Sequence, residues 1–222
     1  MKMPQRKIAV IAGASGLIGS RLLEQLLRSP EYTRVISVGR RKLPLKNEKL
    51  EQLISDFSDL KKYDIWTETS VVFCCIGTTM KKAGSKEAFR RVDYEIPVRL
   101  AEAASLADAQ FHLVSSIGAS VTTSNFYLRT KGETEAFLRS AGLRSVHIYR
   151  PSLLLGKRAE FRFGEKLGIW LYSTFSWLML GPLRKYKGIQ AEKVAAAMLH
   201  FSLRKAEAGV FIHENSELLD VS

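Results

Sequence analysis

The sequence is poor in cysteine and contains no repeats. Its 222 residues include two cysteines, the adjacent Cys74 and Cys75. Adjacent cysteines form no CxxC redox pair and no zinc site by themselves, and two cysteines exclude a disulfide scaffold. Such sparing use of cysteine is typical of a reducing compartment, so we expect a cytoplasmic protein. The lack of a repeat of solenoid length and of low-complexity tracts excludes repeat and disordered architectures.

Histidine is also scarce, and the four histidines show no metal-binding pattern. His112 and His147 fall within apolar stretches, where we expect packing roles. His200 and His213 have no partner at the spacing of metal ligands. We therefore predict no metal site.

Negative charge is the third deficit, because 22 Asp and Glu stand against 34 Lys and Arg, which gives a formal net charge of +12. A basic excess suits nucleic acid, an anionic membrane or an anionic small ligand, and composition alone does not separate them. No groove-reading motif is present, so we expect no nucleic-acid partner and favour a small-molecule ligand.

Hydrophobic residues make up 46% of the chain, and their spacing alternates between that of strands and that of helices. Strands are predicted at 7–12, 33–39, 50–56, 70–76, 109–115 and 145–149. Helices are predicted at 20–28, 85–107 and 127–141, the second of them bent or restarted at Pro97. This alternation is the signature of βαβ units. We predict an α/β fold with a doubly wound parallel sheet and helices on both faces.

A glycine-rich turn, GASGLIG, directly follows the first predicted strand and opens the first helix. Gly13 permits the sharp turn, Gly16 lets the backbone approach a pyrophosphate, and Gly19 lets the helix pack on the strand. The helix N-terminus then presents N–H groups and a positive dipole end to phosphates. An ordinary βα turn is the alternative, but this context favours a dinucleotide site in a Rossmann-type fold. The residues predicted to contact the dinucleotide here are Gly13, Ser15, Gly16, Leu17, Ile18 and Gly19.

Two arginines follow the second predicted strand. NAD-binding folds carry an acidic residue about 20 residues past the glycine turn, where it binds the ribose 2′-hydroxyl. This chain has Arg40 and Arg41 there, and no acid between Val35 and Lys42. A carboxylate would repel a 2′-phosphate, whereas a guanidinium can bind it with two hydrogen bonds, so we predict NADP(H) as the cofactor. Two solvated surface arginines are the alternative.

The strand–helix alternation stops after residue 151. We predict a dinucleotide-binding Rossmann core at 1–151 and a small, α-rich substrate or lid segment at 152–222, with a helix at 190–204 and a short strand at 209–213. The second segment is small for an independent domain, so we expect it to return to the core within one compact domain.

One stretch of the C-terminal segment, residues 167–183, has no charged residue and is flanked by lysines and arginines. We expect it to cover the substrate cleft or to form an oligomer contact, in a monomer or a homodimer. Weak association with a membrane surface is the alternative, because tryptophans and flanking cations suit an interface. A membrane-spanning helix is the third option, and the glycines, proline and hydroxyl residues of the stretch argue against it.

One of the seven tyrosines lies in a YxxxK pattern, formed by Tyr127 and Lys131. On a helix these positions share a face, so the phenol and the ammonium can point into one cleft. A nearby cation stabilises a phenolate, which makes the tyrosine a usable proton donor or acceptor for a carbonyl–alcohol pair. Ser115 and Ser116 end a predicted strand, and a hydroxyl there can orient a substrate carbonyl. A surface helix pair and a serine capping a strand end are the alternatives.

In combination, these motifs resemble the short-chain dehydrogenase/reductase superfamily, and more specifically its atypical branch. The segments that carry the resemblance are GASGLIG (13–19), CIGTT (75–79), KAGSKEAFRRVD (82–93), LVSSIGAS (113–120), NFYLRTKGETE (125–135) and YRPSLLLG (149–156). The resemblance covers about residues 7 to 156 well and the rest of the chain only loosely.

The resemblance implies a role for each matching position. Tyr127 would be the general acid/base and Lys131 would hold the nicotinamide ribose. Ser116 would orient the carbonyl, with Ser115 as the second candidate for that role. The other implied cofactor contacts are Asp56 and Phe57 at the adenine, Cys75, Ile76 and Gly77 at the adenine ribose, Ser115, and Pro151, Ser152 and Leu153 at the nicotinamide. Asp93 departs from the family, since many members have asparagine there, which leaves a proton relay and a simple anchor for the helix both open.

We therefore predict an NADP(H)-dependent oxidoreductase that transfers hydride to or from a carbonyl or alcohol substrate. The first alternative is an NADPH-sensing regulatory protein with little or no turnover. The second is an enzyme like the nucleotide-sugar epimerases and dehydratases.

Overall fold

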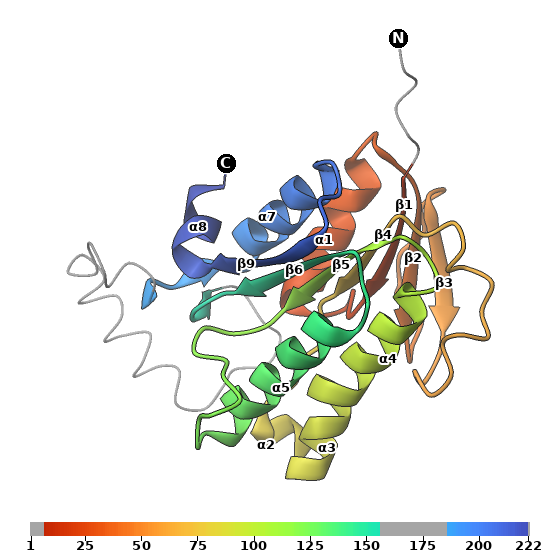
Figure 1. Ribbon diagram of the computed structural model, residues 1–222. Coiled ribbons are helices and arrows are strands. Elements are labelled where there is room, and N and C mark those ends of the chain that lie inside the picture. Colours follow the sequence, from red (N-terminus) through yellow and green to blue (C-terminus); the bar gives the residue numbers. More distant parts are fainter. Residues whose placement is uncertain (1–6, 156–185, 222) are drawn as a thin grey trace.

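The computed structural model describes residues 7–155 and 186–221, and these form one parallel sheet flanked by helices (Figure 1). The sheet has seven strands in the order β3-β2-β1-β4-β5-β6-β9. The strands are β1 (Lys7–Ala12), β2 (Tyr32–Gly39), β3 (Leu50–Ile54), β4 (Val71–Cys74), β5 (Gln110–Val114), β6 (Ser145–Arg150) and β9 (Gly209–Glu214). Every neighbouring pair is parallel, which confirms the predicted α/β fold of Rossmann type.

Helices cover both faces of the sheet. α1 (Leu17–Arg28) and α7 (Ala191–Leu203) lie on one face, and α4 (Ile96–Ala104) and α5 (Phe126–Ser140) lie on the other (Figure 1). Strand β1 explains this arrangement, because its side chains alternate between two hydrophobic cores, one on each face of the sheet. Ala9 and Ile11 pack with α1 and α7, whereas Val10 and Ala12 pack with α4. A strand buried on both faces must be apolar along its whole length, as KIAVIA is.

The strand order places a switch point at β1. From β1 the chain builds outward to β2 and β3 on one side, then crosses over to β4 and builds outward on the other. In open parallel sheets, ligands bind outside the carboxyl ends of the strands at such a point. The glycine turn after β1 and the CIGTT segment after β4 therefore face the same crevice.

The helix predicted at 85–107 is continuous but irregular. It consists of α3 (Lys86–Arg90), a π-helical turn (Arg91–Glu95) and α4, and the helical backbone continues through Pro97. The predicted bend or restart at Pro97 is therefore close in position: α4 begins at Ile96 with Pro97 in its first turn, but the backbone before it is already helical. The wider turn precedes the proline, with the Ile96 N–H bonded to Arg91 O, and Thr134 Oγ1 donates to the Asp93 carbonyl at 2.9 Å. A side chain from α5 thus satisfies a carbonyl whose helical partner would be Pro97, which has no N–H.

The C-terminal part of the chain contributes to the same sheet. β9 pairs with β6 along its whole length, and α7 packs beside α1. Two short parallel strands, β7 (Leu154–Leu155) and β8 (Ile189–Gln190), and two short helices, α2 (Met80–Ala83) and α8 (Asn215–Asp220), were not expected from the sequence. The division of the chain at residue 151 stays a prediction.

The apolar stretch 167–183 lies outside the described residues, so its expected roles stay predictions. Within residues 7–155 and 186–221, no helix combines the length and the apolar character needed to cross a membrane. The same residues contain no group of three or more potential metal ligands.

Candidate active site

The glycine turn is shaped by contacts between backbone atoms. Gly13 has a φ of +86°, and a Cβ there would lie 2.6 Å from the carbonyl of Cys75 at the end of β4. At Gly19, a Cβ would lie 2.1 Å from the Gly13 carbonyl oxygen. Gly16 closes the turn by donating its N–H to Gly13 O at 2.9 Å. Both close approaches exclude any side chain, so α1 begins directly against the ends of β1 and β4.

The N-terminus of α1 suits the phosphates of a dinucleotide. Its N-cap residue is Gly16, no side chain caps it, and no acidic residue lies in the first turn. The first N–H groups of a helix have no intrahelical partner, and a nearby anion can accept their hydrogen bonds. The missing side chains at the three glycines also leave the backbone open to close approach. These residues fit a bound pyrophosphate.

A pocket of about 710 Å³ lies at this edge of the sheet. Much of the predicted site lines it, namely Ser15, Gly16, Leu17, Ile18, Cys75, Ile76, Gly77, Ser115, Tyr127 and Lys131. The structure thus brings the glycine turn of α1, the end of β4 and the YxxxK pattern of α5 around one cavity. Helix α5 starts at Phe126, with Asn125 as its N-cap, so Tyr127 and Lys131 are one turn apart at its beginning.

The residues predicted at the adenine end lie farther along the same edge. Arg40 and Arg41 follow β2 and are exposed, and neither pairs with a carboxylate within residues 7–155 and 186–221. Asp56 is exposed beyond β3 and accepts bonds from the N–H and hydroxyl of Ser58. Phe57 has a φ of +68°, unusual for a residue with a side chain, and its ring is buried in the core. Its backbone, rather than its ring, is therefore the part that can face a ligand.

Lys131 is buried and ion-paired. Its Nζ lies 2.8 Å from Asp93 Oδ1, and the two side chains are 6% and 0% exposed. Burial alone lowers the pKa of Lys131, but attraction to the Asp93 carboxylate outweighs it, so the pKa lies above the ordinary value for lysine. Asp93 Oδ2 accepts the Thr78 N–H at 2.8 Å. Asp93 therefore links the π-helical turn to the loop after β4 and to α5, as an anchor would.

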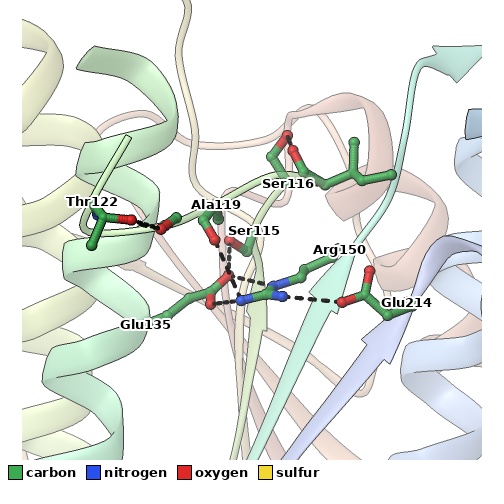
Figure 2. Close-up of polar contacts among 9 residues, drawn as sticks. Ser115, Ser116, Ala119, Thr122, Glu135, Arg150 and Glu214 are labelled. Carbon is green, nitrogen blue, oxygen red and sulfur yellow. Dashed lines mark hydrogen bonds and ion pairs between the residues drawn. The ribbon is translucent and has the colours of Figure 1, made fainter. Parts of the chain in front are cut away.

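The two serines after β5 differ in their surroundings. Ser115 is buried, lines the pocket and donates its hydroxyl to Glu135 Oε1 at 2.5 Å. Ser116 is half-buried and its hydroxyl contacts the carbonyl of Ile117 at 3.3 Å (Figure 2). The Ser115 hydroxyl at the pocket thus already donates its hydrogen to Glu135, whereas Ser116 is not among the described residues that line the pocket. Its role as the orienting residue stays a prediction.

The segment 151–153 is fixed by the C-terminal part of the chain. The Ser152 N–H donates to Asn215 Oδ1 at 2.9 Å, and Asn215 is fully buried. The Pro151 carbonyl accepts the Ile117 N–H at 3.0 Å, so the segment lies beside the serine turn. Neither Asn215 nor this connection was expected from the sequence.

Sequence reasoning also missed the loop between β4 and α3. Thr78, Thr79, Lys81 and Lys82 line the pocket, and the last two belong to α2. Thr79 caps this helix through Lys82 N–H, and Gly84 ends it with a φ of +80°. A threonine followed by a glycine five residues later is the signal that could have predicted this one-turn helix.

Comparison with known proteins decides the family. The sequence matches the NAD dependent epimerase/dehydratase family over residues 9–162. The chain belongs to this family. Among individual relatives, protein HTATIP2 of Rattus norvegicus is 32% identical over 220 residues, which cover 97% of this chain and 89% of that protein. "Protein FMP52, mitochondrial" of Candida albicans is 32% identical over 187 residues, which cover 78% and 80% of the two chains.

Solved structures of the family share this fold at low identity. MoeE5 in complex with UDP-glucuronic acid and NAD has a TM-score of 0.66 and 21% identity, covering 93% of this chain and 76% of that chain. A short-chain dehydrogenase/reductase family oxidoreductase from Burkholderia thailandensis has a TM-score of 0.66 and 16% identity, covering 98% and 94%. The resemblance to atypical short-chain dehydrogenases/reductases is confirmed, and a nicotinamide dinucleotide is the cofactor that this family membership supports.

Proposed function

We propose that the protein is an NADP(H)-dependent oxidoreductase that interconverts a carbonyl compound and an alcohol. The observation that carries the proposal is the common pocket, in which the glycine turn of α1 and the Tyr127–Lys131 pair of α5 line one cavity of about 710 Å³. A phosphate cradle and a proton donor at two ends of one cavity are what hydride transfer to a carbonyl requires.

The protein's part in the reaction is positioning and proton transfer. The bound nicotinamide would supply the hydride. Tyr127 donates a proton to the substrate oxygen in reduction and accepts it in oxidation, and the Ser116 hydroxyl orients that oxygen. Lys131 supplies a fixed positive charge beneath Tyr127, and Asp93 holds it in place from 2.8 Å. In the direction of reduction, the carbonyl carbon takes up the hydride and the carbonyl oxygen takes up the proton, which gives the alcohol.

The mechanism is tested with Tyr127→Phe. This variant keeps the ring that packs 5.5 Å from Phe89 and removes the proton donor. Wild type and variant are mixed with NADPH and a panel of carbonyl compounds. In the oxidising direction they are mixed with NADP+ and UDP-sugars, because structural relatives were solved with UDP-glucuronic acid or UDP-glucose. We expect the variant to bind NADPH and to lose turnover by at least about 10²-fold. Equal turnover in the two proteins would refute the role of Tyr127.

The choice of NADP(H) over NAD(H) rests on Arg40 and Arg41. Both are exposed just beyond β2, where a 2′-phosphate would find a guanidinium instead of the acid typical of NAD sites. Arg40→Asp should shift the ratio of NADPH to NADH affinity toward NADH. Arg139→Asp, an equal change of charge on an exposed part of α5, is the control and should leave the ratio unchanged. An unchanged ratio in Arg40→Asp would mean that the 2′-phosphate is bound elsewhere.

A second candidate is an NADPH-sensing regulatory protein with little turnover. The observation in its favour is that the Lys131 ammonium, although it lines the pocket, is already paired with Asp93 at 2.8 Å and lies 3.5 Å from the Val114 carbonyl, which leaves it fewer free N–H groups for a ligand. Pull-downs with and without NADPH discriminate the two. A partner set that changes with NADPH, together with absent turnover, would favour sensing, whereas turnover without such a change would favour the enzyme.

We further propose a cytoplasmic location, supported by the sparing use of cysteine, and a monomer or homodimer. Several fungal relatives carry "mitochondrial" in their names, so a mitochondrial location is the competing proposal. Fractionation of the native cells decides between them.

A further inference from the structure

A cluster of charged side chains lies beside the serine turn (Figure 2), and none of its three members, Glu135, Arg150 and Glu214, is among the described residues that line the pocket. Glu135, on α5, is 3% exposed and accepts bonds from Arg150 Nε at 3.1 Å and from Arg150 Nη2 at 2.6 Å. Arg150 Nη1 donates to Glu214 Oε1 at 3.0 Å. Ser115 Oγ donates to Glu135 at 2.5 Å. One guanidinium thus joins two carboxylates, and one of these holds a serine of the pocket.

The cluster connects four segments of the chain. Glu135 belongs to α5, Arg150 ends β6 and Glu214 ends β9. The fourth segment is the turn after β5, since Arg150 Nη2 lies 3.5 Å from the Ala119 carbonyl. Helix α5 carries Tyr127 and the turn carries Ser116, so the same arginine contacts both of the elements that must meet at a substrate.

Backbone packing brings these two elements into direct contact. A Cβ at Gly132 of α5 would lie 2.4 Å from the carbonyl carbon of Ser120, and the Ser120 N–H is bonded to Leu128 O at 3.3 Å. This contact sets how closely α5 and the turn approach. Arg150 and Glu135 add side-chain bonds to the same turn, at the Ala119 carbonyl and at the Ser115 hydroxyl.

We propose that Arg150, with Glu135 and Glu214, forms a positioning clamp that fixes the Ser116 turn relative to Tyr127 on α5. The clamp rests on the proposed oxidoreductase function, because that reaction requires the two hydroxyl groups to meet one oxygen atom. Arg150, Glu135 and Glu214 do not touch substrate in this role; they act through the turn and the helix.

Directional bonding is the physical reason for a clamp made of charges. Moving charged groups out of water costs free energy. Apolar side chains in the same place would therefore hold these segments together as firmly as the ions do. A guanidinium bound to a carboxylate by two parallel bonds fixes angle as well as distance, which apolar packing does not. The hydrogen bonds with Glu135 raise the pKa of Arg150, so the guanidinium stays ionised throughout the working pH range.

The test compares Arg150→Lys with wild type in the full chain. Lysine keeps the charge and loses the planar fork. The matched control is Arg144→Lys, next to the other end of β6, where the pair with Asp108 is exposed. Steady-state kinetics on the carbonyl panel give kcat and KM, and a titration gives the dissociation constant of NADPH. Amide hydrogen exchange is measured for the 115–120 and 7–12 segments. Glu135→Gln, which keeps the shape of the side chain and removes its charge, is the second variant should Arg150→Lys fold poorly.

We expect Arg150→Lys to lower kcat by roughly 10- to 100-fold, with the NADPH dissociation constant within about twofold of wild type. Exchange should rise in the 115–120 segment and stay unchanged in 7–12, and Arg144→Lys should match wild type throughout. Unchanged exchange at 115–120 would overturn the clamp, and so would raised exchange with an unchanged kcat. A wild type that binds NADPH and reduces nothing refutes the oxidoreductase proposal, and the exchange of the 115–120 segment then decides the clamp alone.

Discussion

The two ends of the pocket are held together by different kinds of contact. At the phosphate end, Gly13 and Gly19 bring backbone against backbone, at distances that leave no room for a Cβ. At the Tyr127 end, the supporting groups are ion pairs: Lys131 with Asp93, both buried, and the buried Glu135 with the half-buried Arg150. In the proposed function, one end would bind phosphates with helix N–H groups, and the other would hold the proton-transfer groups in place through charge.

The difference shows how each end responds to change. A backbone contact tolerates no added atom, because neither partner can move without moving a strand. A buried ion pair tolerates no lost partner, because the remaining charge stays away from water. Additions should therefore damage the phosphate end, and deletions should damage the Tyr127 end.

The largest effect is expected from deleting the Asp93 carboxylate. Asp93→Ala leaves the Lys131 ammonium, 6% exposed, without its counter-charge and should lower the free energy of unfolding by about 3–5 kcal/mol. Asp108→Ala deletes the acid of an exposed pair with Arg144 and should cost less than about 1 kcal/mol. Urea denaturation measures both. Similar losses of stability in the two variants would mean that burial does not determine the cost of deleting the acid, and would contradict the expected sensitivity of the Tyr127 end to deletions.

A smaller effect is expected from adding one methyl group at the phosphate end. Gly19→Ala places a Cβ 2.1 Å from Gly13 O and should lower the free energy of unfolding by about 1–3 kcal/mol, with NADPH binding weakened or lost. Gly39→Ala is the control, since its Cβ would meet nothing closer than 3.8 Å. Thermal denaturation and NADPH titration measure the two variants. Gly19→Ala binding NADPH as wild type does would show that the turn can relax.

The contrast also explains what the sequence could predict. The glycine turn, the alternation of strands and helices, and the YxxxK pair were predictable, because each rests on residues within a few positions of one another and on a period that strand or helix geometry imposes. The fold follows from apolar runs such as those of β1 and β4, whose burial on both faces leaves no other arrangement.

The supporting ions were not predictable, because their partners are far apart in sequence. Glu135 and Arg150 are separated by 15 residues, and Arg150 and Glu214 by 64. No local pattern indicates which acid meets which base across β6 and β9. Ser115 was predicted as a cofactor contact, but the bond from its hydroxyl to Glu135, 20 residues away, was not predicted.

Three histidines form a third kind of buried site, in which the groups stay neutral. His112, His147 and His213 stack across β5, β6 and β9, and His147 Nδ1 lies 2.9 Å from His213 Nε2. The sequence predicted packing for the first two and, for His213, no partner at the spacing of metal ligands. The packing is observed, but the pairing of His147 with His213, 66 residues apart, and the contact of His213 with Glu217 were missed.

These histidines predict how stability depends on pH. Burial, then the neighbouring His213, lowers the pKa of His147 to about 4, and burial also lowers the pKa of His112 and of His213. In the unfolded chain each histidine binds a proton near pH 6.5, so the unfolded state gains protons first as the pH falls. Stability should be complete above about pH 6.5 and decrease below it, by at most about 1.4 kcal/mol per pH unit for each histidine.

His147→Phe should flatten that decrease between about pH 6.5 and 5, because phenylalanine stacks like the imidazole and takes up no proton. His200→Gln is the control, since His200 is exposed on α7 and should leave the slope unchanged. Urea denaturation across this pH range gives the slopes of the three proteins. If wild type and His147→Phe lose stability in parallel, His147 does not contribute to the decrease. His112 and His213, whose pKa values burial also lowers, would then be the buried groups of the stack that make the fold sensitive to acid.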